Sequence, residues 1–262
     1  MNNLLTKIED IPKNRELIIF DLDGTLVESK SEIDGKMAEL FKKLLEKNRV
    51  AVIGGGKYEL FQQNLVSKLN APDKLLKKLF LFPVTATSFY RYESGEWKLV
   101  YSNNFSAEQR EKVFEAFKKV FAELNYTHPE KIYGELIEDR DSQITFSALG
   151  QLAPLDLKNE WKEENEGIKI KIAEALRKLL PDMEVRVAGT TSIDVTAKGI
   201  DKEYGIHQIK ERLGIPLEKM FFVGDALFPG GNDYAALNTG IPCFLVQGIE
   251  DTKKIIRHIL SD

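Results

Sequence analysis

The sequence has one cysteine, three histidines and no long apolar run, and each shortage excludes a class of protein. The single Cys243 rules out an internal disulfide and fits a reducing compartment. His128, His207 and His258 are widely separated along the chain, which argues against a histidine zinc site and against a Ser-His-Asp triad. No apolar stretch approaches the ~20 residues that a membrane-spanning helix needs.

The excess of negative over positive charge is also small. The formal net charge is −4 over 262 residues, which gives no electrostatic reason to expect nucleic acid or an anionic membrane as a partner. The composition, with 43% hydrophobic and 30% charged residues, is that of an ordinary globular protein. Lys7 and Glu9 interrupt any signal-peptide pattern near the start. We therefore expect a cytoplasmic protein with no membrane partner.

Apolar runs of strand length alternate with amphipathic segments of helix length, a pattern typical of an α/β fold with a parallel sheet. The apolar runs predict buried strands at 17–20, 50–53, 220–223 and 243–246. The amphipathic segments predict helices at 36–47 and 58–69, after Asp201 and at the C-terminal end.

The middle of the chain departs from this alternation. It predicts a hairpin within 88–105, strands within 132–148 and at 185–187 and 193–195, and a helix at 167–180. Ser106 and Gln109 have the spacing of a capping box and predict the start of another helix. We therefore expect a discontinuous core domain, residues 1–87 and 198–262, and an inserted α+β domain, residues 88–197.

Two aspartates, Asp21 and Asp23, follow the first apolar run and precede Gly24. In an extended segment residues i and i+2 point to the same side, so both carboxylates can face one ligand at the carboxyl end of a strand, where open α/β sheets react. Two like charges this close require a cation or a shared proton. An aspartate beside magnesium can attack phosphorus. Asp-Gly is also a common turn sequence, but the strand before it favours a site.

A second acidic cluster follows the predicted strand at 220–223. Asp225 ends this run, and Asp233 closes the loop that comes after it. Oxygen ligands from separate strand ends suit magnesium, which keeps several waters and needs few protein carboxylates. The alternative is a glycine-rich turn with incidental acids; the preceding strand again favours a site.

Phosphoryl transfer also needs donors around the equatorial phosphoryl oxygens. Gly54, Gly55 and Gly56 lie between a predicted strand and a predicted helix, where backbone N–H groups can bind an anion. Lys198 and Lys202 flank the start of another predicted helix, where a cation opposes the helix dipole. A lysine in that place indicates a role other than helix stability.

The segment Phe20-Asp21-Leu22-Asp23-Gly24-Thr25-Leu26 resembles the first motif of the haloacid dehalogenase superfamily of phosphotransferases. The resemblance implies that Asp21 is the nucleophile. It also implies that Asp23 is the general acid/base and that its backbone carbonyl helps to hold magnesium.

The second acidic cluster and one of the two lysines extend the resemblance. Gly-Asp followed by Gly-Gly-Asn-Asp is similar to the fourth motif of the superfamily, which implies that Asp225 is a magnesium ligand. Asn232 and Asp233 then hold either the water shell of the metal or the lysine. Lys202 matches the third-motif lysine, and Lys198 is interpreted as a solvated bystander.

The glycine triplet matches the second motif less well. Members of the superfamily usually have Ser or Thr where this chain has Gly56, so a hydroxyl donor is missing. Gly55 and Gly56 are therefore expected to bind phosphate through the backbone. Whether Lys57 replaces the missing hydroxyl is left open.

The insert resembles one branch of the superfamily. Residues 134–151, 192–195 and 229–233 are similar to segments of the eukaryotic-type phosphomannomutases. This implies a Rossmann-like haloacid dehalogenase core with a type IIB (C2B) cap that closes over a phosphosugar. In those mutases three cap arginines hold the distal phosphate, and a serine and an aspartate contact the sugar. The matching positions, in that order, are Arg140, Gln151, Lys158, Ser192 and Asp194.

Two of the three arginine positions differ from the mutase pattern. Gln151 carries no charge, and Lys158 cannot make the bidentate contact that an arginine makes with phosphate. Arg140 lies among acids, so a salt bridge to Glu138, Asp139 or Asp141 is the alternative to a role in binding.

These features predict a magnesium-dependent phosphatase that acts on a small phosphorylated metabolite of the sugar-phosphate class through an aspartyl-phosphate. A phosphomannomutase-like sugar phosphomutase is the first alternative, and a catalytically silent phosphosugar-binding protein is the second. Gln151 and Lys158 favour the hydrolase over the mutase, and the intact Asp21, Lys202 and Asp225 argue against the silent protein. We expect a monomer or a cap-mediated homodimer.

Overall fold

The structure is a computed structural model that describes residues 3–28 and 31–261. Its contacts divide the chain into two compact units. The first contains Met1–Ser102 and Asp201–Asp262, and the second contains Asn103–Ile200. Each unit is described by itself below.

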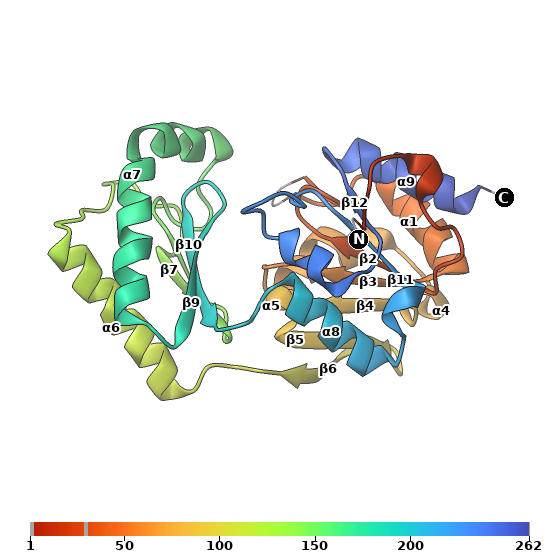
Figure 1. The fold of residues 1–262 in the computed structure, drawn as a ribbon, viewed down its shortest axis with the longest axis horizontal. Helices are drawn as coiled ribbons and strands as arrows, with labels where there is room; N and C mark the ends of the chain where they lie inside the picture. Colours follow the sequence, from red (N-terminus) through yellow and green to blue (C-terminus); the bar gives the residue numbers. More distant parts are fainter. Residues whose placement is uncertain (1–2, 29–30, 262) are drawn as a thin grey trace. The chain divides into compact units, whose positions relative to one another are not determined.

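The first unit is built on one sheet (Figure 1). Among the described residues eight strands form it, in the order β1-β12-β11-β2-β3-β4-β5-β6. The first six strands of this order, β1, β12, β11, β2, β3 and β4, pair in parallel. Strands β5 and β6 add an antiparallel hairpin at one edge. The strands are β1 (Leu4–Leu5), β12 (Cys243–Leu245), β11 (Met220–Gly224), β2 (Leu17–Asp21), β3 (Arg49–Ile53), β4 (Leu79–Phe82), β5 (Ser88–Glu93) and β6 (Glu96–Ser102).

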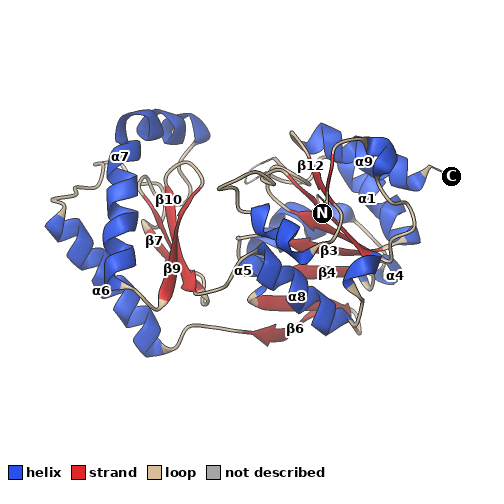
Figure 2. Ribbon diagram, in the orientation of Figure 1, coloured by secondary structure: helices blue, strands red, loops and turns tan. Residues whose placement is uncertain are grey.

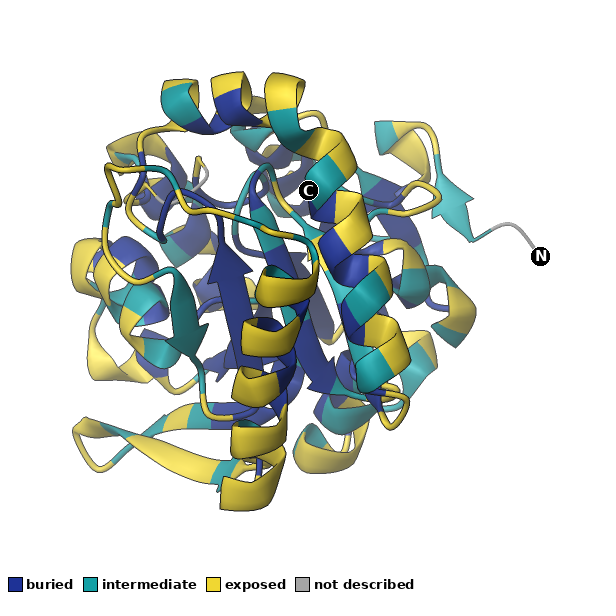
Figure 3. Ribbon diagram, turned by 90° about the vertical axis from the view of Figure 1, so that its left-hand side faces the viewer, coloured by how far each residue is buried: buried dark blue, intermediate teal, exposed yellow. Residues whose placement is uncertain are grey.

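Helices cover both faces of this sheet (Figure 2), which explains why its central strands are apolar without alternation. Ile18 and Phe20 pack toward α1 (Gly35–Lys47) and α9 (Ile249–Leu260). Leu17 and Ile19 pack on the other side, with α8 (Lys202–Leu213) and the 3₁₀ segment η4 (Tyr234–Thr239). Every residue of β2, β4 and β11 is buried, whereas the helices of the chain carry both buried and exposed residues along their turns (Figure 3).

The remaining short segments link these elements. The helix predicted at 58–69 is a continuous run of α2 (Tyr58–Phe61), the π-helical η2 (Gln62–Val66) and α3 (Ser67–Leu69). It ends at Asn70 in the left-handed conformation, a common helix stop. The other short helices of the first unit are η1 (Ile8–Asp10), α4 (Asp73–Leu76) and η3 (Leu217–Lys219).

A strained turn follows β4. In the segment α5 (Pro83–Ala86), the residues Val84, Thr85 and Ala86 have φ of 48°, 54° and 62°. Left-handed helical geometry costs L-residues ~1–2 kcal/mol each, so the surroundings must hold this turn in place.

The second unit is a sheet with two helices on one face (Figure 1). Its described strands lie in the order β7-β8-β10-β9 and pair antiparallel. Apolar side chains of one sheet face, such as Phe146, pack on α6 (Ala107–Glu123) and α7 (Leu155–Leu179), and polar side chains line the other face. The strands are β7 (Ile137–Asp139), β8 (Gln143–Ser147), β9 (Met183–Ala188) and β10 (Ser192–Ala197).

The observed elements confirm an α/β core with an inserted α+β unit, and two boundaries differ from the sequence-based expectation. The hairpin at 88–102 pairs with β4 and extends the core sheet, so the compact insert begins at residue 103 rather than 88 and ends at 200 rather than 197. The helix predicted at 167–180 begins at residue 155, because its charged first turns are anchored by the buried Trp161. The capping box of Ser106 and Gln109 is present and opens α6.

Candidate functional site

Asp21 is the last residue of β2, and the chain turns tightly after it. The Gly24 N–H donates to the Val27 carbonyl at 2.8 Å, and Asp23 bridges to Val27. Gly24 has a φ of +77°, and a Cβ at this position would collide with the Asp225 carboxylate. The glycine therefore lets the end of β2 approach the end of the adjacent β11, which brings the two predicted acidic motifs together.

Lys202 joins these motifs from the first turn of α8. Its Nζ donates to Asp21 Oδ1 and to the Ile53 carbonyl at 3.1 Å, and it forms an ion pair with Asp233 Oδ1 at 2.9 Å. The side chain is only 2% exposed, so these partners replace water completely. Lys198 is exposed and lies in the second unit. The structure thus places Lys202 beside the aspartates.

The electrostatics of the cluster show a shortage of positive charge. Burial raises the pKa of Asp21 well above its usual value, and Asp233 and Asp225 add to this effect against the attraction of Lys202. Burial and the neighbouring Asp233 raise the pKa of Asp225 to about 6. Burial alone would lower the pKa of Lys202, but Asp21 and Asp233 outweigh it and raise that pKa. The lysine stays charged, and one ammonium does not balance the surrounding carboxylates.

A divalent cation fits this shortage. Within the described part of the chain, Asp21, Asp225 and Asp233 each offer a carboxylate oxygen, and these oxygens lie within 4.8 Å of one another. An all-oxygen donor set without histidine or thiolate suits magnesium. The side chain of Asp23 is not in this group, so its predicted contribution to the metal site is through its backbone carbonyl, and its carboxyl stays the predicted general acid/base.

Asp233 and Asn232, the last two residues of the fourth motif, differ in burial. Asp233 is fully buried, pairs with Lys202 and accepts a hydrogen bond from the Ala226 N–H at 3.1 Å. Of the two roles that the resemblance implied for it, this geometry matches the one of holding the lysine. Asn232 is exposed.

The glycine triplet follows β3 directly. The carbonyls of Gly54 and Gly56 accept hydrogen bonds from the backbone N–H groups of Thr85 and Val84, at 2.8 and 3.0 Å. A Cβ at Gly55 would meet nothing within 4 Å, whereas a Cβ at Gly56 would lie 3.0 Å from Leu60 Cδ1. A serine at position 56 would therefore press on Leu60.

In the second unit, three of the predicted cap residues are connected. Arg140 donates to Glu138 at 2.7 Å and to Gln151 Oε1 at 3.3 Å. Lys158 is buried, and its Nζ donates to the Gln151 carbonyl at 3.2 Å. The salt bridge considered as the alternative for Arg140 is therefore present, with Glu138 as the partner.

The polar face of the same sheet extends this network to Asp194. Gln151 Nε2 donates to the Thr145 carbonyl at 3.2 Å, and the Thr145 hydroxyl donates to Asp194 at 2.8 Å. Gln143 donates to the Thr145 hydroxyl at 2.9 Å. Burial raises the pKa of Asp194 against the opposing effects of Arg140 and Thr145.

Sequence reasoning missed Gln143 and Thr145 as members of this network. The alternation of Gln143, Thr145 and Ser147 with apolar neighbours was the available signal, because alternate strand residues share a face. Ser192 lies two residues before Asp194 on β10 and is half-buried.

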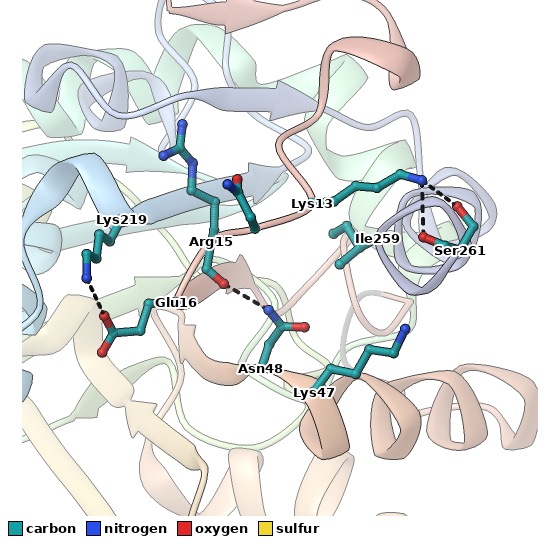
Figure 4. Close-up of a pocket in the computed structure, with 9 residues that line it drawn as sticks. Lys13, Arg15, Glu16, Lys47, Asn48, Lys219, Ile259 and Ser261 are labelled. Atoms are coloured by element: carbon teal, nitrogen blue, oxygen red, sulfur yellow. Dashed lines mark hydrogen bonds and ion pairs between the residues drawn. The ribbon is translucent and has the colours of Figure 1, made fainter.

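A cationic hollow lies elsewhere in the first unit, at the amino ends of the parallel strands (Figure 4). Its volume is 730 Å³. Three of its cations donate to backbone carbonyls, which are Lys13 to Ser261, Lys47 to Leu260 and Arg15 to Glu218, and Lys219 pairs with Glu16. Lysines that bond the last carbonyls of a helix stabilise its C-terminus, which accounts for Lys13 and Lys47 without a ligand.

Comparison with known proteins gives consistent results. Residues 37–262 match the family model of eukaryotic phosphomannomutase. The chain is 29% identical to the phosphomannomutase of Encephalitozoon cuniculi over 238 aligned residues. This alignment covers 86% of this chain and 85% of that protein. It is 27% identical over 227 residues to human phosphomannomutase 1, with coverages of 85% and 83%.

Solved structures resemble the fold at lower identity. The IMP-nucleotidase of Plasmodium falciparum superimposes with a TM-score of 0.70 at 16% identity, covering 97% of this chain and 70% of that one. A haloacid dehalogenase-like hydrolase from Bacteroides thetaiotaomicron gives 0.58 at 17% identity, with 92% of both chains covered. These matches confirm the haloacid dehalogenase fold. Within the described residues, no helix combines the length and apolar character needed to cross a bilayer.

Proposed function

Because the chain belongs to the eukaryotic phosphomannomutase family, we propose that this phosphoryl-transfer enzyme moves a phosphoryl group between positions of a hexose phosphate. The observation that carries the proposal is the contact of Lys202 with both Asp21 and Asp233, beside Asp225. This contact brings the proposed nucleophile and the proposed metal ligand, at the ends of adjacent strands, next to a buried cation at the start of α8.

Magnesium is proposed as the cofactor. Asp21, Asp225 and the backbone carbonyl of Asp23 would hold it, while Asp233 orients Lys202. When bound, the ion supplies charge neutralisation at the phosphoryl oxygens. Chelation should abolish activity, and added magnesium should restore it; full turnover in chelator would contradict this site.

The residues of the first unit account for the chemistry in two steps. A carboxylate oxygen of Asp21 attacks phosphorus, the bond to the ester oxygen breaks, and Asp23 protonates that oxygen. Asp23 then takes the proton of an acceptor hydroxyl, which attacks phosphorus and breaks the bond to Asp21. Lys202 and the N–H groups near Gly55 and Gly56 stabilise charge on the equatorial oxygens.

The insert is proposed to select the sugar. Arg140, Gln151, Lys158, Ser192 and Asp194 are assigned to this role through the family resemblance. The polar network on one sheet face offers donors and acceptors of the kind that hydroxyl groups need, which supports a sugar-phosphate substrate.

Hydrolysis is the second candidate, and a specific observation favours it. Gln151 replaces a cap arginine, Lys158 is buried against the Gln151 carbonyl, and Arg140 is paired with Glu138. A mutase must retain a sugar bisphosphate while it reorients, and fewer phosphate clamps would let water capture the aspartyl-phosphate. The relatives are named phosphomannomutases, so the mutase replaces the phosphatase predicted from Gln151 and Lys158 as the leading proposal.

The discriminating experiment follows mannose 1-phosphate by ³¹P NMR with magnesium and a trace of hexose bisphosphate. A mutase yields mannose 6-phosphate faster than inorganic phosphate. Release of inorganic phosphate as the main product would establish the hydrolase. Binding of mannose 1-phosphate without formation of either mannose 6-phosphate or inorganic phosphate would indicate the catalytically silent protein. The expectations of a cytoplasmic location, of no nucleic acid or membrane partner, and of a monomer or cap-mediated homodimer stay predictions.

A further inference from the structure

The left-handed turn after β4 has no counterpart in the mechanism above. Val84, Thr85 and Ala86 adopt positive φ in succession, and none of them is glycine or asparagine. Two of the three are β-branched in a conformation that chirality disfavours for all L-residues. Strain of this kind persists only where the surrounding structure over-determines it.

The turn contacts the glycine loop on one side. The Val84 N–H donates to the Gly56 carbonyl at 3.0 Å, and the Thr85 N–H donates to the Gly54 carbonyl at 2.8 Å. The Gly54 N–H in turn donates to the Phe82 carbonyl at 3.4 Å. Two successive amides of the turn thus fix the first and last carbonyls of the loop that is proposed to bind phosphate.

On its other side the turn meets the helix that carries Lys202. A Cβ added at Gly205, one turn into α8, would lie 3.4 Å from Ala86 Cβ and would collide with Ile53. Glycine at this position lets α8 approach both the turn and the end of β3. The turn therefore packs between the loop and the lysine helix.

Two hydroxyl groups hold the carbonyls of the turn. The Thr87 hydroxyl donates to the Val84 carbonyl at 2.8 Å, and the Tyr101 hydroxyl donates to the Ala86 carbonyl at 2.5 Å. Tyr101 belongs to β6, so the hairpin at the edge of the core sheet contributes one of the two hydrogen bonds that hold the turn, and we call this pair of bonds the lock.

We propose that the Val84–Ala86 turn, locked by Tyr101, is a positioning element that holds the Gly54–Gly56 loop in its phosphate-binding conformation. The proposal rests on the proposed function of that loop. Tyr101 acts through the turn and touches no reacting atom, so it is a positioning residue.

Tyr101→Phe tests the lock, because phenylalanine keeps the ring and removes the hydroxyl. We expect hydrogen exchange of the Val84 and Thr85 amides to accelerate about tenfold, and the Kd for orthovanadate with magnesium to rise about tenfold. The matched control is Tyr92→Phe, which removes a hairpin hydroxyl that bonds Asp73 instead of the turn. It should change neither quantity.

The two readouts separate failure of this proposal from failure of the proposed function. If the wild-type protein does not bind vanadate, the phosphoryl site is wrong, and the exchange rates still decide whether Tyr101 holds the turn. If Tyr101→Phe matches the wild-type protein in both exchange and vanadate binding, or loses only thermal stability, the positioning role is overturned.

A second pair of variants tests the strain itself. Thr85→Gly and Thr85→Ala both delete the side-chain hydroxyl, and only the alanine keeps a Cβ at φ of 54°. We expect the glycine variant to melt about 2–4 °C higher than the alanine variant, since glycine adopts this conformation without steric cost. Equal or lower melting of the glycine variant would show that the turn is not strained.

Discussion

Replacing Lys202 by methionine should destabilise the protein in a way that depends on both pH and magnesium. Methionine keeps an unbranched side chain, one heavy atom shorter, and leaves Asp21 and Asp233 buried without their cation. Removing one partner of a buried ion pair costs about 3–5 kcal/mol, which is a large fraction of the ~5–15 kcal/mol that stabilises a typical domain. We expect this loss in urea unfolding at a pH of about 8 without metal.

The pH dependence follows from the directions of the pKa shifts. The pKa of Lys202 is raised, so its stabilising contribution is fully present in the wild-type protein at and below neutral pH. The pKa of Asp225 is raised to about 6, so this carboxyl takes up a proton as the pH falls through that value, and the pKa of Asp21 is raised in the same direction. The loss in Lys202→Met should therefore shrink at a pH of about 5.5.

Magnesium and a matched control complete the test. Added magnesium should restore part of the lost stability at a pH of about 8, because the ion neutralises the same carboxylates. Lys198→Met removes an exposed lysine and should change the free energy of unfolding by no more than about 0.5 kcal/mol. Equal, small effects of both variants, or a Lys202→Met effect independent of pH and magnesium, would refute the reasoning.

Three other predictions address the two units separately. Asp194→Asn should raise the melting temperature at neutral pH, because burial raises the pKa of this carboxyl and its negative charge then destabilises the folded protein above that pKa. The gain in melting temperature should vanish toward a pH of about 4, and a gain that does not change with pH would contradict the prediction. Asp21→Asn should lower turnover by at least about 10³-fold with unchanged circular dichroism, and appreciable activity in pure variant would exclude Asp21 as nucleophile. The Gln151→Arg, Lys158→Arg double variant should raise the ratio of isomerisation to phosphate release by roughly tenfold or more, because each charge-assisted contact with phosphate is worth about 1.5–3 kcal/mol. An unchanged ratio would show that these two positions do not help to retain the substrate.

The sequence was most informative where one local rule decided the structure. Strand-length apolar runs ending in Asp21 and near Asp225 correctly indicated two buried strands with acidic ends, because a strand buried on both faces is apolar throughout. That the two strands are neighbours in the sheet is a finding of the structure. The spacing of Ser106 and Gln109 likewise predicted the start of α6, since a capping box satisfies specific backbone donors.

Long-range packing limited the rest of the prediction. No periodicity shows that the hairpin at 88–102 pairs with β4, because strand signals do not identify the partner strand. The Val84–Ala86 turn has no sequence signal, since the residues that usually mark positive φ are absent from it. The ion pair of Asp233 with Lys202 became clear only from the fold, which brings together two segments 31 residues apart that offered several possible partners.

The most direct test of the central claim is covalent labelling of Asp21 during turnover. The protein is mixed with mannose 1-phosphate and magnesium, quenched in acid within one turnover and digested for mass spectrometry. The account predicts one added phosphoryl group on the peptide that contains Asp21, and none in Asp21→Asn. Turnover without any phosphorylated intermediate, or with the phosphoryl group on another residue, would contradict it.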